Sequence, residues 1–230
     1  MKKLLTVVVC AMVFTTAKSQ IYVQGGLNLA NITTTNTGGT QHNNLLTTFN
    51  AGIMARSNKN EPIALEAGLL VDGRGAKSNS YLTSSTEDNY VKANFNPLYL
   101  ELPVNFVLRL PLTHKNNIFI NAGPYVAMGI GGKTKIETSF LGVKSNSTST
   151  IRFNNDDPTT SQQEEASYDK LKKFDYGVNL GAGIDLKKIL LKVNYGYGLA
   201  KINSTQTNNS SDNKNKYRIV SISLGIPLGL

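Results

Sequence analysis

The segment 98–109, which reads LYLELPVNFVLR, constrains the fold more than any other stretch of this chain. Successive side chains of a β-strand point to opposite faces of the sheet, so alternate residues share a face. One face of this segment is mainly polar. The opposite face is apolar without interruption and is formed by Leu98, Leu100, Leu102, Val104, Phe106 and Leu108. A strand of about ten residues with one apolar and one polar face is typical of a membrane-spanning β-barrel.

Seven further segments show this period-two alternation, which predicts eight strands in total. The predicted strands are 21–32, 45–56, 63–73, 98–109, 117–131, 174–186, 189–202 and 218–230. Beyond residue 20 no apolar run approaches the roughly 18 residues that indicate a membrane-spanning helix. A closed barrel is the other architecture that satisfies every backbone polar group inside a bilayer. We therefore predict an all-β fold, an eight-stranded antiparallel up-and-down transmembrane β-barrel.

The connections between these strands alternate in length. Four long outer loops, near residues 33–44, 74–94, 132–173 and 203–216, alternate with three short turns at 57–62, 111–116 and 187–188. Outer-membrane barrels place long loops outside the cell and short turns in the periplasm, which predicts that both chain ends are periplasmic. The long loops are rich in Ser, Thr, Asn and Gly and poor in apolar residues, so we expect them to be mobile and solvated.

The amino terminus has the pattern of a cleaved secretory signal. Two lysines precede an apolar run of about 11 residues, and the small residues Ala17 and Ser19 stand before the expected cleavage site. This run is shorter than the roughly 20 residues that a spanning helix needs. We therefore predict a signal peptide at 1–19 and a single barrel domain at 20–230, exported to the bacterial outer membrane. Cys10, the only cysteine, leaves with the signal, which removes disulfides and thiolate metal sites from the mature chain.

The polar faces of the predicted strands carry the charged residues, which we expect to line the barrel interior. An eight-stranded barrel is just wide enough inside for side chains, and charges buried there must pair. Glu66 is expected to pair with Arg56 or Lys192. Glu101 is expected to share the same cations as partners. We expect the whole network of charged side chains to plug the lumen. The predicted structural network consists of Arg56, Glu66, Glu101, Arg109, Asp175 and Lys192, with Asp72 and Asp185 on the same parity.

The apolar faces carry almost no charge, as expected where Lys or Arg on the lipid side at mid-bilayer costs about 2–4 kcal/mol. Aromatic residues near strand ends are expected to form girdles at the membrane interfaces, with ordinary packing as the alternative for each of them. The residues expected in the girdles are Tyr22, Phe174, Tyr176, Tyr195, Tyr197 and Tyr217.

No motif in the chain indicates catalysis or cofactor binding. The two histidines, His42 and His114, lie in connections without a motif that joins them to a nucleophile and an acidic partner. Gly181 and Gly183 lie inside a strand pattern, whereas a dinucleotide-binding loop joins a strand to a helix. The formal charge of +9 suggests nucleic acid, but the basic residues are scattered and no recognition motif is present. We therefore predict no catalytic site, no cofactor, no metal and no nucleic-acid partner.

Six sequence blocks stand in order along almost the whole mature chain. They are GLNLANI from Gly26, ALEAGLLVDGRGAKS from Ala64, YLELPVNF from Tyr99, NAGPYVAMG from Asn121, FDYGVNLGAGID from Phe174 and VNYGYGLAKI from Val193. Together they resemble the PorT-like outer-membrane β-barrel proteins of Bacteroidetes. The resemblance implies an eight-stranded outer-membrane barrel and, through the family's named member, a link to protein secretion. It supplies no catalytic motif, so no site residues follow from it.

These patterns predict a monomeric, plugged outer-membrane barrel with a structural or interaction role. Its partners would be outer-membrane lipid and envelope proteins that dock on the loops or the periplasmic turns. The first alternative is a soluble lipocalin-like carrier of apolar ligands, which would need the apolar faces inside the barrel. The second is a small barrel enzyme that acts on envelope lipid, which would need His42 or His114 at a strand end facing the outer leaflet.

Overall fold

The structure is a computed structural model of the 230-residue chain. It describes residues 19–36, 39–42, 45–57, 61–81, 89–113, 116–153, 170–186, 188–202 and 215–228. The predicted signal peptide lies outside these residues except for Ser19, and His114 lies outside them as well. In the described part of the chain, no helix is long and apolar enough to cross a membrane.

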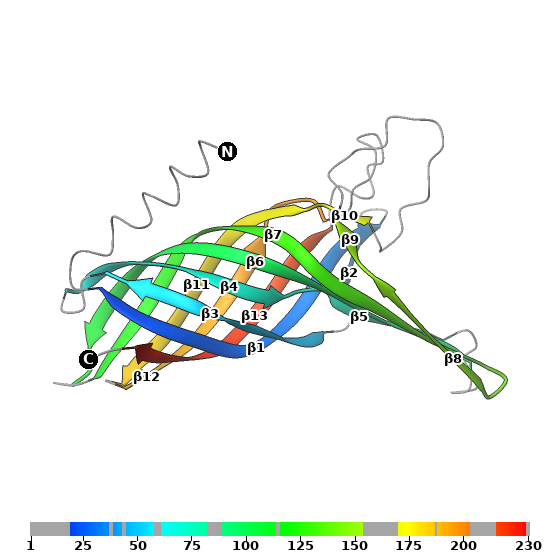
Figure 1. The fold of residues 1–230 in the computed structure, drawn as a ribbon, viewed down its shortest axis with the longest axis horizontal. Coiled ribbons are helices and arrows are strands. Elements are labelled where there is room, and N and C mark those ends of the chain that lie inside the picture. The colour runs from blue at the N-terminus through cyan, green and yellow to red at the C-terminus, as the bar shows by residue number, and fades with distance from the viewer. Residues whose placement is uncertain are drawn as a thin grey trace.

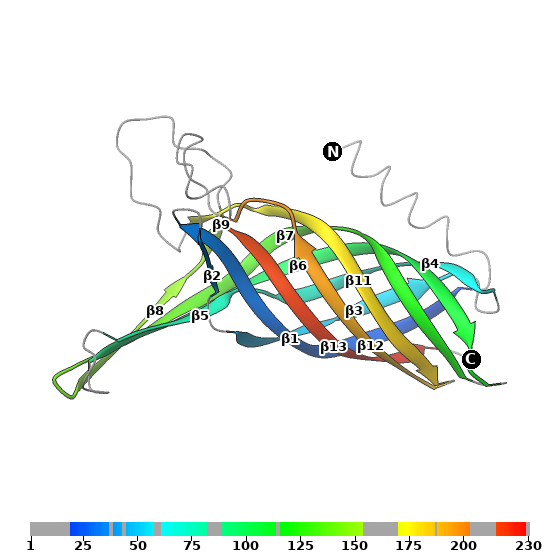
Figure 2. The ribbon, with the colours of Figure 1, turned by 180° about the vertical axis from the view of Figure 1, so that it is seen from behind.

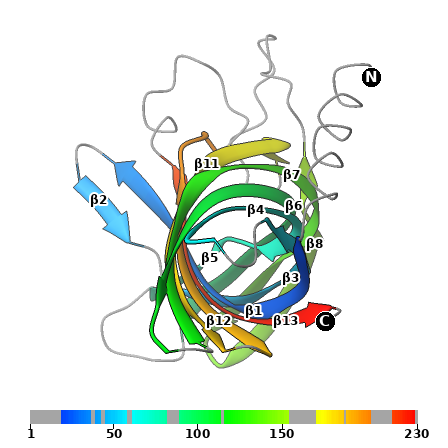
Figure 3. The ribbon, with the colours of Figure 1, turned by 90° about the vertical axis from the view of Figure 1, so that its left-hand side faces the viewer.

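Eight long strands form a closed antiparallel ring (Figures 1 and 3). In chain order they are β1 (Gln20–Asn36), β3 (Leu46–Arg56), β4 (Ile63–Gly73), β6 (Tyr90–Pro111), β7 (Asn116–Phe140), β11 (Phe174–Leu186), β12 (Ile189–Gly198) and β13 (Lys216–Leu228). Each pairs with its neighbours in the chain, and β1 pairs with β13 to close the ring; Figure 2 shows β1, β13, β12 and β11 side by side. The predicted eight-stranded up-and-down barrel is therefore confirmed.

The two ends of the barrel differ in their connections. β1 begins and β13 ends at the left of Figure 1, where the paired ends of β3 and β4, β6 and β7, and β11 and β12 also lie. We call this end the turn end and the opposite one the loop end. In barrels that cross the outer membrane the short turns are periplasmic, so we expect the loop end to face outside the cell.

The faces of the strands have the orientation that a membrane requires. Val178 and Ile222 point outward with 43% and 56% of their surface exposed, whereas Glu101 and Lys192 point inward with 6% and 4% exposed. An apolar wall of this kind is stable against hydrocarbon, and the charged side chains are withdrawn from it. The soluble carrier would need the reverse arrangement and is not favoured.

Four strands continue beyond the barrel at the loop end as an open sheet, which we call the flange. It consists of β5 (Ala76–Tyr81), the first part of β6, the last part of β7 and β8 (Val143–Thr150), paired in that order. Figures 1 and 2 show it projecting past the ring. The long connections 74–94 and 132–173, which were predicted as loops, therefore contain strands over 76–81, 132–140 and 143–150, because these segments pair with one another and with β6 beyond the barrel.

A single interruption separates β4 from β5. Both strands pair with β6 in the same register, and the pairing is interrupted between them at Arg74 and Gly75 and within β4 at Gly68 and Leu69. Gly75 has φ of +128°, and a Cβ atom there would lie 1.9 Å from the carbonyl oxygen of Phe95. Only glycine fits this position without strain. The bend leaves Arg74 fully buried in the lumen.

A buried apolar cluster lies at the loop end of the barrel. β9 (Arg152–Phe153) and β10 (Lys170–Leu171) pair there in parallel. Leu171 is fully buried in this cluster, and the ring of Phe153 meets the ring of Tyr99 edge-on at 5.3 Å. His42 lies elsewhere, in β2 (Gly39–His42), which pairs with the outer end of β1.

The aromatic residues expected in the girdles divide between the two faces of the wall. Phe174, Tyr176, Tyr195 and Tyr197 are exposed on the outside. Tyr22 and Tyr217 lie inside the lumen with 1% exposed, so the girdle prediction was wrong for these two. Each stands on the inward parity of its strand, which decides the direction of the side chain whatever its position along the strand.

Candidate functional site in the lumen

Glu66 is the centre of an ion cluster near the turn end. Its Oε2 atom accepts hydrogen bonds from Nε and Nη2 of Arg56 at 2.9 and 2.5 Å, and its Oε1 atom accepts one from Nζ of Lys192 at 2.5 Å. The hydroxyl of Tyr22 donates at 2.8 Å and the amide of Asn105 at 3.2 Å. One fully buried carboxylate therefore has two cations and two neutral donors as partners.

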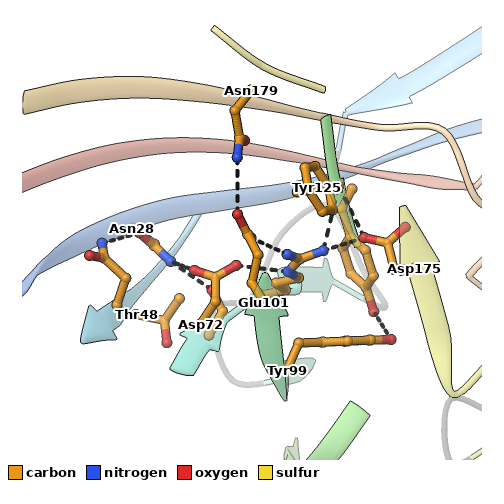
Figure 4. A network of polar contacts seen from close by, with 12 residues as sticks. Asn28, Thr48, Asp72, Tyr99, Glu101, Tyr125, Asp175 and Asn179 are labelled. Atoms are coloured by element: carbon orange, nitrogen blue, oxygen red, sulfur yellow. Dashed lines mark hydrogen bonds and ion pairs between the residues drawn. The ribbon is translucent and has the colours of Figure 1, made fainter. Parts of the chain in front are cut away.

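Arg74 is the centre of a second ion cluster, nearer the loop end. In this cluster carboxylates surround one cation, whereas in the first cluster two cations bind one carboxylate. Nε of Arg74 donates to Asp72 at 2.8 Å, its Nη2 to Glu101 at 2.5 Å, and its Nη1 to Asp175. Figure 4 shows these three carboxylates converging from different strands. One buried cation thus holds three acidic side chains together across the lumen, which ties β4, β6 and β11 to one another.

Neutral side chains complete the coordination of the second cluster. Each of the three carboxylates accepts one further hydrogen bond, from Asn28, from Asn179 at 3.0 Å or from the hydroxyl of Tyr125 at 3.0 Å. The guanidinium carbon lies 5.0 and 4.8 Å from the ring centroids of Tyr99 and Tyr125 and 5.8 Å from that of Tyr217. Cation–π contacts of this kind stabilise a desolvated cation, so the tyrosines contribute to holding the arginine.

The space between the clusters is filled by amides and hydroxyls. Asn50 accepts hydrogen bonds from Gln24 at 3.2 Å and Ser223 at 3.0 Å, and donates one to Asn28 at 2.7 Å. A cavity lined by side chains of both clusters has a volume of about 30 Å³. A volume of this size has room for roughly one or two water molecules. The described lumen therefore leaves no space for a larger solute at this level.

The six residues predicted for the lumen network are all buried, but they do not form one network. Glu66 pairs with both of its expected cations. The prediction that Glu101 shares them was wrong, because Glu101 pairs with Arg74 instead. Arg109 lies near the turn end, where its Nη1 donates to the backbone carbonyl of Glu61 at 3.3 Å. The first cluster thus contains Arg56, Glu66 and Lys192, with Asp185 at 3.8 Å from Nη1 of Arg56. The second contains Glu101 and Asp175, together with Asp72.

Arg74 is the important residue that sequence reasoning missed. The strand pattern 63–73 ends just before it, so the sequence analysis places it at the start of the long connection 74–94. The signal was nevertheless present, since Arg74 has the same parity as Glu66 and Asp72 in β4. Continuing the alternation by two residues would have placed its side chain in the lumen beside Asp72.

The described residues offer no arrangement suited to metal-dependent chemistry. No group of three or more His, Cys, Asp or Glu side chains in the described ranges could hold a metal ion. Asp72, Glu101 and Asp175 are each paired with the guanidinium of Arg74. What this geometry does is cross-link the strands from inside the barrel.

A closed ring of eight antiparallel strands, with a lipid-compatible wall and an ion-paired interior, defines a small β-barrel of the bacterial outer membrane. The chain belongs to the outer membrane protein beta-barrel domain family, whose model matches residues 15–204. It is accordingly an outer-membrane protein. No curated protein sequence matches the chain significantly.

Several solved barrels are similar to this chain at low identity. Ail, the attachment invasion locus protein of Yersinia pestis, is 11% identical, with 91% of this chain and 99% of that chain covered and a TM-score of 0.40. Neisserial surface protein A is 12% identical, with 90% and 97% covered and a TM-score of 0.39. The N-terminal barrel domain of Pseudomonas aeruginosa OprF is 8% identical, with 89% and 97% covered and a TM-score of 0.28.

Proposed function

We propose that this protein is a closed, monomeric membrane anchor with a structural or interaction role, which presents the flange and its loops outside the cell. The observation that carries the proposal is the filled lumen. Two ion clusters and a layer of amides occupy its cross-section, and the cavity between them measures about 30 Å³. A barrel filled in this way serves as a rigid support, because the ion pairs of Glu66 and Arg74 link β4 and the residue after it to β3, β12, β6 and β11.

Planar-bilayer recording tests whether the lumen is closed. The purified mature chain should give no steady channel openings, whereas a general porin in the same membrane provides the positive control. Arg74→Ala removes the side chain that holds three carboxylates together and should increase ion leakage relative to the parent. Steady openings of the unmodified protein would refute the closed anchor.

A non-enzymatic role is part of the same proposal. The alternative, a barrel enzyme acting on envelope lipid, depends on His42 or His114. Replacing both with alanine and comparing the lipid composition of the envelope separates the two roles: the anchor predicts no change.

A link to protein secretion, which the PorT-like resemblance implies, stays a prediction. It requires that envelope proteins bind the loops or the periplasmic turns. Co-purification from detergent-solubilised outer membranes tests it, with a variant that lacks the flange residues 76–81 and 143–150 as the matched control. Loss of a secretion component from that variant alone would place the contact on the flange.

A further inference from the structure

The outward face of the flange continues the lipid-facing wall of the barrel. β6 and β7 stay paired from Pro111 and Asn117 near the turn end to Tyr90 and Ser139 in the flange. Outward residues of the flange therefore stand in line with the apolar residues that cover the wall. What changes along the strands is the chemistry of the side chains, from apolar to basic and polar.

A β-bulge determines which residues of β7 lie on this face. The register shifts opposite Leu98 and Tyr99, so that odd-numbered residues of β7 face inward before the shift and outward after it. A shift of one residue reverses every later side chain. Without the bulge, Lys133 and Lys135 would point toward the interior side of the sheet. With it, both lysines are exposed on the outward face.

This face is strongly basic. Lys92 and Glu137 stand opposite each other in the ladder, and Glu137 is the only acid on the face among the described residues. Glu137 also accepts a hydrogen bond from the hydroxyl of Tyr90 at 2.6 Å, and this bond raises the pKa of Tyr90. The basic side chains on the face are Lys77, Lys92, Lys133, Lys135 and Lys144.

An open groove of about 390 Å³ runs across the centre of this face. The lining of the groove includes three lysines and three asparagines from four different strands: Lys77, Asn79, Lys92, Asn94, Lys135 and Asn146. Ammonium groups attract phosphate, and amides both donate hydrogen bonds to hydroxyl groups and accept them. This combination of side chains suits a saccharide that carries phosphate.

The groove lies above the ordinary headgroup layer of the outer leaflet. Ile130 is an exposed residue of the apolar wall, and the groove residues Lys135 and Glu137 follow five and seven residues later. At about 3.3 Å per residue and a tilt of roughly 40°, they stand about 13 and 18 Å above Ile130 along the membrane normal. Ordinary headgroups extend roughly 5–8 Å beyond the hydrocarbon. The groove therefore lies beyond that layer, at a height that sugars attached to a lipid can reach.

We propose that the groove on the outward face of the flange binds the phosphorylated sugars of lipopolysaccharide in the surrounding outer leaflet. The lysines would pair with phosphates and the asparagines with sugar hydroxyls. Continuity of this face with the lipid-facing wall favours a lipid-borne ligand over a free polysaccharide. The proposal rests on the proposed orientation, with the loop end outside, but not on a closed lumen.

The test is a binding titration of the mature chain, refolded in zwitterionic detergent micelles. The probe is rough-type lipopolysaccharide, compared with the same lipid after enzymatic dephosphorylation and with a soluble sulfated disaccharide. The groove variant combines Lys77→Gln, Lys92→Gln and Lys135→Gln, three substitutions on the described surface that keep polar side chains. Its matched control removes the same charge away from the face, by Lys172→Gln, Lys188→Gln and Lys216→Gln.

We expect the groove variant to bind rough-type lipopolysaccharide at least tenfold more weakly than the parent, and the control variant to bind within twofold of it. Each basic residue near an anionic surface contributes on the order of fivefold in affinity, so three together exceed this threshold. Dephosphorylation should weaken binding to the parent but hardly affect the groove variant. Heat-dependent gel mobility verifies that every variant is folded.

Two results would overturn the proposal. In the first, the groove variant binds the lipid as tightly as the control variant does, which would show that these three lysines do not bind the lipid. In the second, the soluble sulfated disaccharide competes for the groove as strongly as the lipid, which would identify a free anionic saccharide as the ligand. A closed or an open lumen in the bilayer recordings changes neither outcome.

Discussion

Replacing Arg74 with methionine should be among the most destabilising single substitutions in the barrel. The substitution keeps an unbranched chain but removes the charge that holds Asp72, Glu101 and Asp175. Three carboxylates would then lie in the lumen with only neutral donors beside them. Breaking a buried ion pair by removing one partner costs about 3–5 kcal/mol, because an uncompensated charge stays buried. We expect a loss in this range from the free energy of unfolding.

Equilibrium unfolding in urea, followed by far-UV circular dichroism of the chain refolded in phosphatidylcholine vesicles, measures the loss. Arg152→Met is the matched control, because Arg152 is exposed and its substitution should change stability by less than about 0.5 kcal/mol. Adding Glu101→Gln to Arg74→Met removes one of the uncompensated charges and should recover part of the loss.

The double substitution is the sharper part of the experiment. If the cost arises from unpaired charge, neutralising Glu101 must be less harmful in the Arg74→Met background than in the parent, which a double-mutant cycle reports directly. A loss below about 1 kcal/mol for Arg74→Met, or strict additivity with Glu101→Gln, would show that the cluster does not stabilise the barrel.

Three further predictions address the wall, the packing and the export signal. Ile222→Lys places a charge on the lipid-facing side and should cost about 2–4 kcal/mol in the same unfolding assay, against almost nothing for Ile222→Val. Gly183→Ala should lower stability by about 1–3 kcal/mol, because its Cβ would lie 2.4 Å from the ring of Phe119. Gly25→Ala, with no atom within 4 Å of its Cβ, is the control and should be neutral. Mass spectrometry of the protein isolated from outer membranes should find Gln20 at its amino terminus; retention of residues 1–19 would contradict the predicted cleavage.

Within the bilayer, the sequence contains nearly all the information needed to place the strands. Each strand of the wall has hydrocarbon on one side and a narrow polar lumen on the other, so apolar and polar side chains must alternate along it. The sequence shows this alternation directly. The predicted strand 63–73 coincides with β4, and 174–186 coincides with β11. The inward and outward directions of Glu101 and Val178 followed from the same pattern.

Outside the bilayer, this signal is weaker because both faces of a sheet can meet water. β8, from Val143 to Thr150, reads VKSNSTST, and seven of its eight residues are exposed. Its polar composition is the same as that of a solvated loop, so composition alone could not predict the strand. Only the ladder with β7 defines it.

Pairing inside the lumen was harder to predict than direction. Parity identified which charged residues face inward, but not how far along the barrel axis each one stands. Glu101 lies beside Arg74, whereas Lys192 lies beside Glu66, because the register between the strands decides which side chains are level. Register depends on ladders between strands distant in sequence, which no local pattern reports.

The long ladder between β6 and β7 has a mechanical consequence. The two strands pair from the turn end to the flange, with a bulge at Leu98 and Tyr99 and a gap in the pairing at Val104 and Asn105. The flange ends in an exposed apolar tip at Phe140, Leu141 and Val143. A force applied at that tip, by a neighbouring cell or by flow, would load the ladder lengthwise, with many backbone hydrogen bonds sharing the stress at once. The tension would pass along the ladder into the wall of the barrel, so the barrel as a whole would resist a pull at the tip.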